Sequence, residues 1–342
     1  MDDLRIGAYL KIMNEWQKLR GLCLYARICV GSVIFLIVLG AIVTSKGAGL
    51  TVPDWPQSYG YNMFLFPYER WVGGIFWEHS HRLVASGIGL MTVILAIWIW
   101  RVDSRRWMKG LGVFAVLLVI FQGILGGVRV VWLKDELGLV HGCTAQLFLA
   151  VIGAIALFTS KIWIERPASS SISKGSVRFV VLIVGLVFLQ LTVGATMRHA
   201  HQGLSIRDFP KAYGQWWPKI SPEQLVGINQ ERLATGHPET TMGLIYLQMV
   251  HRLMAYLLTI LICGVVLKWG RDPRVPQHLR TAFWLWGGGL LVQVILGILT
   301  ILTDRGLEVT SAHVAMGAWT LLLGVLIVIY SGAIAGMWGR RR

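Results

Sequence analysis

Eight apolar segments, each about as long as a membrane-crossing helix, constrain the fold of this chain more than any other feature. A helix needs about 20 mostly apolar residues to cross the hydrocarbon core of a bilayer. Hydrophobic residues fill 55% of the 342 positions and charged residues only 14%, which is too little charge to cover a soluble domain of this size. The sequence therefore predicts an all-α integral membrane protein with eight transmembrane helices, covering approximately residues 27–46, 73–100, 108–130, 138–160, 176–197, 242–268, 279–303 and 309–338.

The distribution of basic residues predicts the orientation of these helices. An even number of spans places both termini on one side of the membrane, and the segments on that side carry 20 of the 32 Lys and Arg residues but only six of the 17 acidic residues. Cytoplasmic loops are enriched in Lys and Arg, so we expect both termini in the cytoplasm and the protein in the inner (plasma) membrane. The net charge of +15 lies in short groups between apolar segments rather than in a tail or along one face, so no nucleic-acid partner is expected.

The segments outside the helices include a polar N-terminal segment and two long outer loops. Residues 1–26 are polar and are expected to be cytoplasmic, and the apolar run that follows them is too long for a cleavable signal peptide. Loops of the length of 47–72 and 198–241 are usually functional in a compact protein, so we expect lids at the membrane surface, although their tryptophans would also suit the interfacial aromatic belt. All four cysteines fall in or beside apolar runs and are expected to be buried thiols: Cys23, Cys29, Cys143 and Cys263.

The two halves of the chain repeat each other. Gly40, Ala41, Gly49, Leu50, Asp54, Pro56, Tyr59 and Gly60 recur as Gly194, Ala195, Gly203, Leu204, Asp208, Pro210, Tyr213 and Gly214. Farther along, Glu78, His81, Arg82, Gln122, Gly126 and His141 correspond to Gln248, His251, Arg252, Gln293, Gly297 and His313. The repeat predicts an N-terminal four-helix half at 27–160, a cytoplasmic linker at 161–175 and a C-terminal half at 176–338, related by an axis along the membrane normal.

Four histidines lie in apolar helices, and each half contributes two of them. They are His81, His141, His251 and His313, all expected near the outer ends of their helices. An ionisable side chain inside a membrane span is costly and usually marks a functional site. Two imidazoles facing each other in a four-helix bundle are the arrangement that a six-coordinate haem iron requires. The alternative for any one histidine is a hydrogen bond to a neighbouring helix, and the repeated pattern favours haem over zinc or copper.

The residues beside these histidines suggest further roles. Arg82 and Arg252 directly follow a histidine, where they would reach either haem propionates or lipid headgroups. Glu78 precedes His81 by one helical turn, whereas its counterpart Gln248 has the same shape without an ionisable group. A carboxylate beside a haem can exchange protons and an amide cannot. We therefore expect one half to react and the other to store or pass electrons, although Glu78 could instead orient a ligating histidine.

Several short motifs, in this order and spacing, resemble one family over nearly the whole chain. They are Gly73-Gly74-Ile75-Phe76-Trp77-Glu78-His79-Ser80-His81-Arg82, Leu139-Val140-His141, Gln248-Met249-Val250-His251-Arg252, Ser311-Ala312-His313 and the outer-loop segment Gly49-Leu50-Thr51-Val52-Pro53-Asp54-Trp55-Pro56. On these residues the chain is similar to the haem A synthases, the bacterial counterparts of a mitochondrial cytochrome oxidase assembly factor.

The resemblance implies an activity and a division of the histidines. The family oxidises the C8 methyl group of haem O to the formyl group of haem A, for cytochrome c oxidase. The resemblance implies that His81 and His141 hold the substrate haem O, with Glu78 in the catalytic role, and that His251 and His313 ligate a cofactor haem b. It also implies haem O and the haem O synthase as partners, and it leaves the electron-transfer partner and a homo-oligomer open. Some members carry paired cysteines in the outer loops, but loops 47–72 and 198–241 contain none, which excludes a thiol–disulfide step through them.

Two other classes of function remain compatible with the sequence. One is a membrane electron-transfer cytochrome with two b-type haems, in which single helices often supply two histidines. The other is a haem carrier or oxidase assembly factor without turnover. The difference between Glu78 and Gln248 disfavours both, because neither needs one site to carry a proton-exchanging group that the other lacks.

Overall fold

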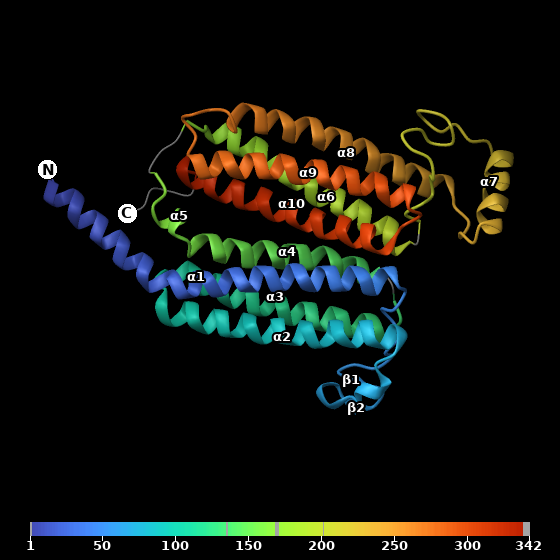
Figure 1. The fold of residues 1–342 in the computed structure, drawn as a ribbon, viewed down its shortest axis with the longest axis horizontal. Coiled ribbons are helices and arrows are strands. Elements are labelled where there is room, and N and C mark those ends of the chain that lie inside the picture. Colours follow the sequence, from blue (N-terminus) through green and yellow to red (C-terminus); the bar gives the residue numbers. More distant parts are fainter. Residues whose placement is uncertain (1, 135, 168–170, 201, 338–342) are drawn as a thin grey trace.

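The structure is a computed structural model, and it describes residues 2–134, 136–167, 171–200 and 202–337, with the side chains of residues 2–12 left aside. In this part of the chain, eight helices are long and apolar enough to cross a membrane (Figure 1). They are α1 (Asp2–Ser45), α2 (Gly73–Val102), α3 (Arg106–Val131), α4 (Glu136–Phe158), α6 (Lys174–His199), α8 (Met242–Trp269), α9 (Gln277–Leu302) and α10 (Leu307–Ile334). The prediction of an all-α protein with eight transmembrane helices is confirmed, and the chain is a multi-pass membrane protein.

The first helix differs from the prediction because it begins far earlier. α1 runs without a break from Asp2, well before the apolar run that begins near residue 27. The reason is an apolar stripe hidden among polar residues: Leu19, Leu22 and Ala26 are spaced by three or four residues and are buried in the core of the N-terminal half. This stripe packs against the rest of the bundle, so the helix continues toward its N-terminus beyond the long apolar run.

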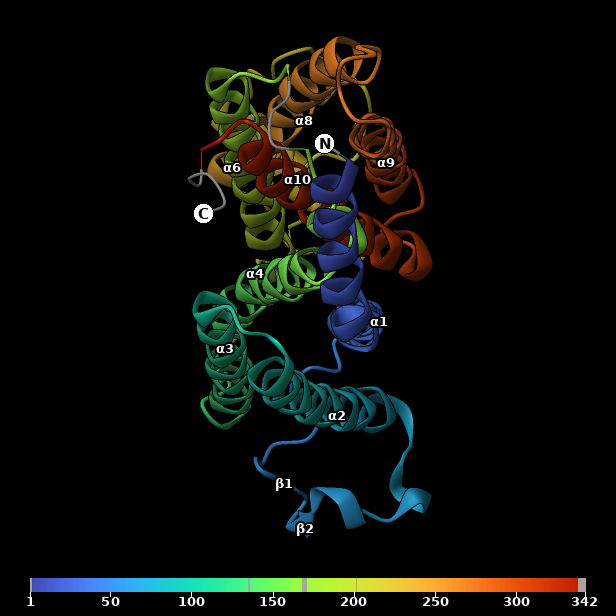
Figure 2. The ribbon, with the colours of Figure 1, turned by 90° about the vertical axis from the view of Figure 1, so that its left-hand side faces the viewer.

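The eight helices form two four-helix bundles that lie side by side. α1, α2, α3 and α4 pack around one apolar core, and α6, α8, α9 and α10 pack around another. Figure 2 shows the two bundles end-on, with α1 and α4 facing α6 and α10. The contact is close: Ala318 and Leu322 of α10 belong to the N-terminal core, and Gly153 of α4 leaves room for Leu322, whose Cδ1 lies 2.3 Å from where a Cβ would stand.

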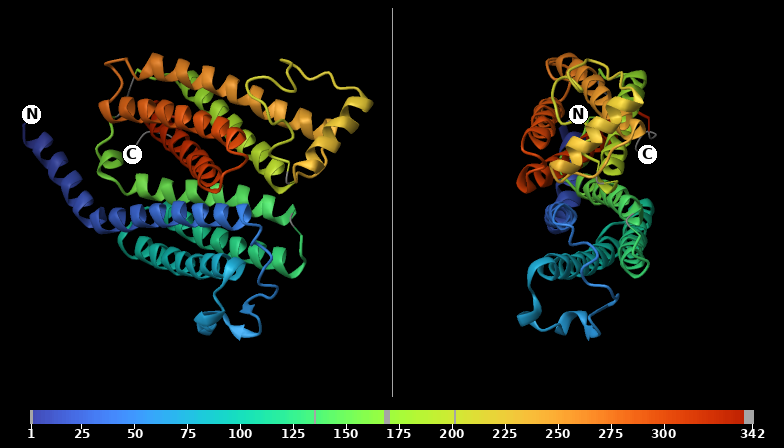
Figure 3. Two further views of the ribbon diagram at one scale, coloured as in Figure 1. Left: turned by 45° about the vertical axis from the view of Figure 1, so that its right-hand side comes forward. Right: turned by 90° about the vertical axis from the view of Figure 1, so that its right-hand side faces the viewer.

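Both long loops lie at the end of the molecule opposite to the start of α1 and the end of α10 (Figures 1 and 3). The first loop contains the short antiparallel strands β1 (Gln57–Ser58) and β2 (Tyr61–Asn62), followed by the 3-10 turns Met63–Leu65 and Tyr68–Arg70. The second loop contains α7 (Pro222–Ala234), which starts with a capping box at Ser221 and Gln224. The connection between the halves carries the short helix α5 (Lys161–Ile164).

The two outer loops share one turn, which the sequence repeat had marked. The carboxylate of Asp54 accepts hydrogen bonds from the backbone N–H groups of Tyr59 (2.7 Å) and Gly60 (2.7 Å). In the second loop the carboxylate of Asp208 accepts from Tyr213 (2.8 Å) and Gly214 (2.9 Å). The two glycines have φ values of +77° and +75°, a conformation that a residue without a Cβ adopts at little cost. The repeated Asp, Tyr and Gly residues are therefore the framework of this turn.

Candidate functional site: two histidine pairs

The four helix histidines form two pairs, one in each bundle. His81 lies on α2 and His141 on α4, and these helices stand at opposite corners of the N-terminal bundle because each packs against α1 and α3. His251 on α8 and His313 on α10 stand at opposite corners of the C-terminal bundle in the same way, between α6 and α9. The two histidines of each bundle lie within electrostatic range of each other. Each bundle thus directs two imidazoles toward its own interior from opposite sides.

Each imidazole packs edge-on against a glycine of the neighbouring helix. A Cβ on Gly40 would lie 3.1 Å from Cε1 of His81, and a Cβ on Gly126 would lie 3.5 Å from Cε1 of His141. The C-terminal half repeats both contacts, at 3.1 Å between Gly194 and His251 and at 3.1 Å between Gly297 and His313. Separations of 3.0–3.4 Å are tighter than nine in ten real Cβ contacts, so a larger side chain at Gly40, Gly194 or Gly297 would push the imidazole aside, whereas 3.5 Å at Gly126 is ordinary van der Waals contact. The glycines therefore allow the neighbouring helix to approach the imidazole closely in both halves.

The histidines also have hydrogen-bonding capacity that the protein leaves unused. All four are half-buried, and the Nδ1 atoms of His81, His141 and His251 are buried without a hydrogen-bond partner. Buried polar atoms are normally paired, and unpaired ones call for an explanation such as a missing ligand. Within the described residues, no three His, Cys, Asp or Glu side chains converge as a metal site. A pair of histidines at the two sides of a bundle fits a haem iron, because the porphyrin supplies its other four ligands.

The glutamine beside the second histidine of each pair makes different side-chain contacts in the two halves. Nδ1 of His313 lies 3.1 Å from the carbonyl oxygen of Gln293, and its Nε2 lies 3.4 Å from the side-chain nitrogen of the same residue. In the N-terminal half the amide of Gln122 instead donates a hydrogen bond to the hydroxyl of Thr144, one turn beyond His141. The C-terminal half has Met316 at that position. The two sites therefore differ beside the ligating imidazole as well as at Glu78.

Glu78 is buried and forms an ion pair with Arg82 under the first outer loop. Its Oε1 accepts from Nη2 of Arg82 at 2.7 Å, and its Oε2 accepts from the backbone N–H of Val52 at 2.8 Å. Both side chains are less than 10% exposed. The guanidinium of Arg82 also donates to three loop carbonyls, those of Val52 (2.6 Å), Asp54 (2.7 Å) and Gln57 (3.1 Å). Glu78 thus contacts the loop and the arginine rather than His81, and it joins the loop to the helix that carries this histidine.

The C-terminal half builds the same junction without the acid. Oε1 of Gln248 accepts from the backbone N–H of Ile206 at 2.7 Å, and its Nε2 donates to the carbonyl of the same residue at 3.1 Å. Arg252 donates to the carbonyls of Asp208 (2.8 Å) and Lys211 (2.9 Å). The loop is therefore anchored in both halves, but only the N-terminal half places a charged pair there.

The structure shows the two arginines donating to loop carbonyls, and their contact with haem propionates stays a prediction. Two other arginines, which the sequence motifs did not indicate, lie near the histidines. Arg129, in the last turn of α3, lies within electrostatic range of His81 and His141. Arg198, in the last turn of α6, lies within range of His313 and donates to the Ala41 carbonyl (2.5 Å) and the Ser45 hydroxyl (2.7 Å) of α1, so it joins the two bundles. The sequence feature that could have indicated both is a basic residue in the last turn of an otherwise apolar helix.

The first loop folds down onto the N-terminal bundle through aromatic residues. The Trp55 ring lies against Gly127 of α3, with its Cδ2 at 2.3 Å from where a Cβ would stand, so only glycine fits there. His79 is fully buried beneath the loop, with Nδ1 at 3.2 Å from the Ser58 hydroxyl and the Trp71 ring at 4.7 Å from its own. These contacts hold the first loop against the end of the bundle, and its role as a lid stays a prediction.

The fold and the site define a multi-pass membrane protein in which duplicated four-helix bundles each enclose a pair of histidines. A family described as "Cytochrome oxidase assembly protein" matches residues 23–327, and the chain belongs to this family. It is similar to proteins named "Heme A synthase" from several bacteria. It is 29% identical to that of Halalkalibacterium halodurans (86% of this chain, 91% of the relative) and 26% identical to that of Geobacillus kaustophilus (82% of each chain). The protein of Shewanella oneidensis is 26% identical over 89% of this chain and 94% of its own length.

Proposed function

We propose that this protein is a haem A synthase, an oxidoreductase that acts on the C8 methyl group of haem O. Membership of the family and relatives named "Heme A synthase" support a role in haem A biosynthesis. The observation that carries the finer assignment is the inequality of the two sites, since both present a histidine pair but only one carries the Glu78–Arg82 ion pair. A protein that only carried electrons or stored haem would not need that inequality.

The two sites bind different haems, one as the substrate and the other as a cofactor. His81 and His141 hold haem O in the N-terminal bundle, and His251 and His313 hold a haem b in the C-terminal bundle. Support comes from the opposite-corner placement of each pair. The bound haem supplies the redox chemistry of the reaction. Two hydroxylations and loss of one water would convert the methyl carbon to the formyl group; this removes four electrons, so turnover requires an external electron acceptor and an external source of the hydroxyl oxygens.

Glu78 acts as a proton donor or acceptor beside the substrate. Its carboxylate lies one helical turn from His81 and is shielded from solvent by the first loop. A general acid or base at such a position contributes roughly 10²–10⁴-fold to a rate. Arg82 holds the carboxylate in place, and the loop residues Val52 and Asp54 hold Arg82. Closing this loop also keeps bulk water from the outer end of the bundle.

The membrane setting follows from the same assignment. The protein lies in the inner membrane with both termini in the cytoplasm and its histidine pairs near the outer face. It takes haem O from the bilayer, where a haem O synthase releases it.

Production of haem A in cells tests this proposal. The chain is expressed, with a haem O synthase, in cells that lack their own haem A synthase, and extracted haems are separated by chromatography. We expect haem A with the wild-type chain and only haem O with a His81→Ala, His141→Ala double variant. Spectra that show two b-type haems without any haem A or hydroxylated haem would favour an electron-transfer cytochrome. Bound haem O that is never converted would favour a carrier.

A further inference from the structure

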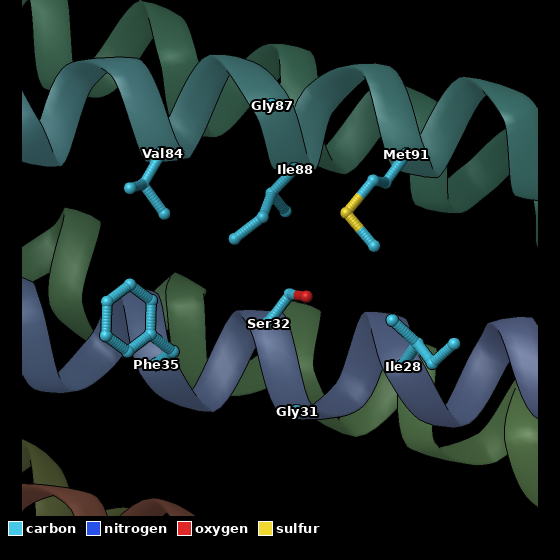
Figure 4. Close-up of a pocket in the computed structure, with 8 residues that line it drawn as sticks. All are labelled: Ile28, Gly31, Ser32, Phe35, Val84, Gly87, Ile88 and Met91. Carbon is cyan, nitrogen blue, oxygen red and sulfur yellow. The ribbon is translucent and has the colours of Figure 1, made fainter.

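An apolar groove between α1 and α2 lies directly below the N-terminal histidine pair. Its volume is about 570 Å³, and it is lined by eight residues: Ile28, Gly31, Ser32, Phe35, Val84, Gly87, Ile88 and Met91 (Figure 4). Ser32 alone among them has a polar side chain. The volume lies within the ~300–1,000 Å³ typical of small-molecule sites.

The groove continues from the position of His81 into the membrane. Val84 follows His81 by one turn of α2, and the ten residues from His81 to Met91 rise about 15 Å along that helix. On α1, Phe35 lies little more than one turn from Gly40, the glycine that packs against His81. Figure 4 shows the side chains of the two helices facing each other, from Val84 and Phe35 at one end to Met91 and Ile28 at the other.

The groove has a floor and two open rims. Ile88 is 3% exposed and closes the bottom, whereas Ile28 and Phe35 are more than half exposed at the edge. Gly31 and Gly87 are exposed, and a Cβ at either position would meet nothing within 4 Å. The glycines therefore keep space open rather than allow close helix packing, and the groove opens toward lipid.

The duplicated half carries larger side chains at two of these positions. The residues that correspond to Ser32 and Gly87 are Leu186 and Leu257, at the offsets that align Gly40 with Gly194 and His81 with His251. Leu186 packs against the core of the C-terminal bundle. Leu257 is 47% exposed, and the counterpart of Gly31 is another glycine, Gly185, so Leu186 is the side chain that narrows this place in the C-terminal half.

We propose that this groove binds the farnesyl chain of haem O and selects that haem over haem b at the N-terminal site. The inference rests on the proposed function, because haem O carries a long farnesyl substituent and haem b has none. A chain attached to a macrocycle between His81 and His141 meets the groove at Val84 and Phe35 and runs inward along it. Leu186 narrows the matching place in the C-terminal half, as suits a haem without a tail.

Filling the groove tests the proposal without touching the histidines. Gly87→Leu introduces the residue of the C-terminal half, and Gly89→Leu, on the same helix with nothing within 4 Å of its Cβ position, is the matched control. Both proteins are purified from cells without a haem O synthase, with haem b in the C-terminal site. The N-terminal site is then titrated separately with haem O and with haem b, followed by difference absorbance.

We expect Gly87→Leu to weaken haem O binding by about tenfold, because the tail loses its packing contacts but can still lie in detergent or lipid. Binding of haem b to the same site and the resident C-terminal haem should not change, and Gly89→Leu should behave as wild type. Unchanged haem O affinity in Gly87→Leu would mean that the groove holds only a lipid chain and would overturn the proposal. An equal loss for both haems would overturn it too, since the defect would lie in the macrocycle site. Failure of the proposed function would appear separately, as absence of haem A in wild-type cells.

Discussion

Replacing Glu78 by glutamine separates the chemical role of this side chain from its structural role. The substitution keeps the shape of the side chain and removes its charge. The C-terminal half already has a glutamine, Gln248, at the equivalent position. Gln248 accepts from the Ile206 N–H at 2.7 Å and donates to the Ile206 carbonyl at 3.1 Å. A glutamine at position 78 can make the same two contacts with Val52, whose N–H now lies 2.8 Å from Oε2. The loop should therefore stay anchored.

The stability cost of Glu78→Gln is bounded by one charge-assisted hydrogen bond. The variant loses the 2.7 Å contact between Oε1 and Nη2 of Arg82, while Arg82 keeps its three bonds to loop carbonyls. Hydrogen bonds to charged groups contribute about 1.5–3 kcal/mol. We expect a loss of this size at most, with folding and the C-terminal haem retained. The expected fall in turnover of roughly 10²–10⁴-fold corresponds to about 3–5 kcal/mol in the barrier, which exceeds the structural effect.

The assay is the haem composition of cells that make haem O together with each variant, combined with thermal unfolding of the purified proteins. Gln248→Glu is the matched control: it offers Arg252 a carboxylate in the other half and should leave haem A production intact. Haem A at near wild-type levels in Glu78→Gln would refute the reasoning, because the carboxylate would then be structural. Loss of haem A with an equally large loss of C-terminal haem would refute it as well.

Three further predictions concern the packing, the loop and the topology. Gly194→Val should displace the His251 ring, 3.1 Å from the new Cβ, and reduce the low-spin b-type signal in redox difference spectra; an unchanged spectrum would contradict the assigned contact. Partial burial would raise the pKa of Asp54, but hydrogen bonds from the backbone outweigh this and lower the pKa, so the turn is stabilised at neutral pH and loses that stabilisation only as the pH falls through the lowered pKa. Asp54→Ala should therefore make the first loop more sensitive to protease at pH 7, whereas equal sensitivity would show that the carboxylate does not hold the turn. Reporter fusions after Arg342 and within 198–241 should be cytoplasmic and external, respectively, and an external C-terminus would overturn the topology.

The helices and the duplication could be predicted because they depend on features that a sequence displays directly. Long apolar runs predicted the transmembrane helices. The repeat predicted two histidine pairs, formed by His81, His141, His251 and His313. The N-terminal extension of α1 was missed, since its apolar stripe is interrupted by charged residues at helical spacing. Composition over a window hides such a stripe, whereas the burial of Leu22 reveals it.

The contacts that define the site could not be predicted, because they join segments distant in the sequence. Nothing in the spacing of Arg82 indicated that its guanidinium binds the carbonyls of Val52 and Asp54, about 30 positions earlier. The repeat marked Gly40 and Gly194 but not the imidazole edges that they receive. The difference between Glu78 and Gln248 was visible from the sequence, and the structure adds the ion pair with Arg82.

The central claim is that the two histidine pairs hold different haems, and chromatography of haems from purified variants tests it most directly. The chain is purified from cells that make haem O, as wild type, as His81→Ala and as His251→Ala. We expect wild type to contain haem b together with haem O or its oxidised products. His81→Ala should lose the farnesylated haem and keep haem b, and His251→Ala should do the reverse. If both variants lost the same haem, or if wild type contained haem b alone at both sites, the division between substrate and cofactor would be contradicted.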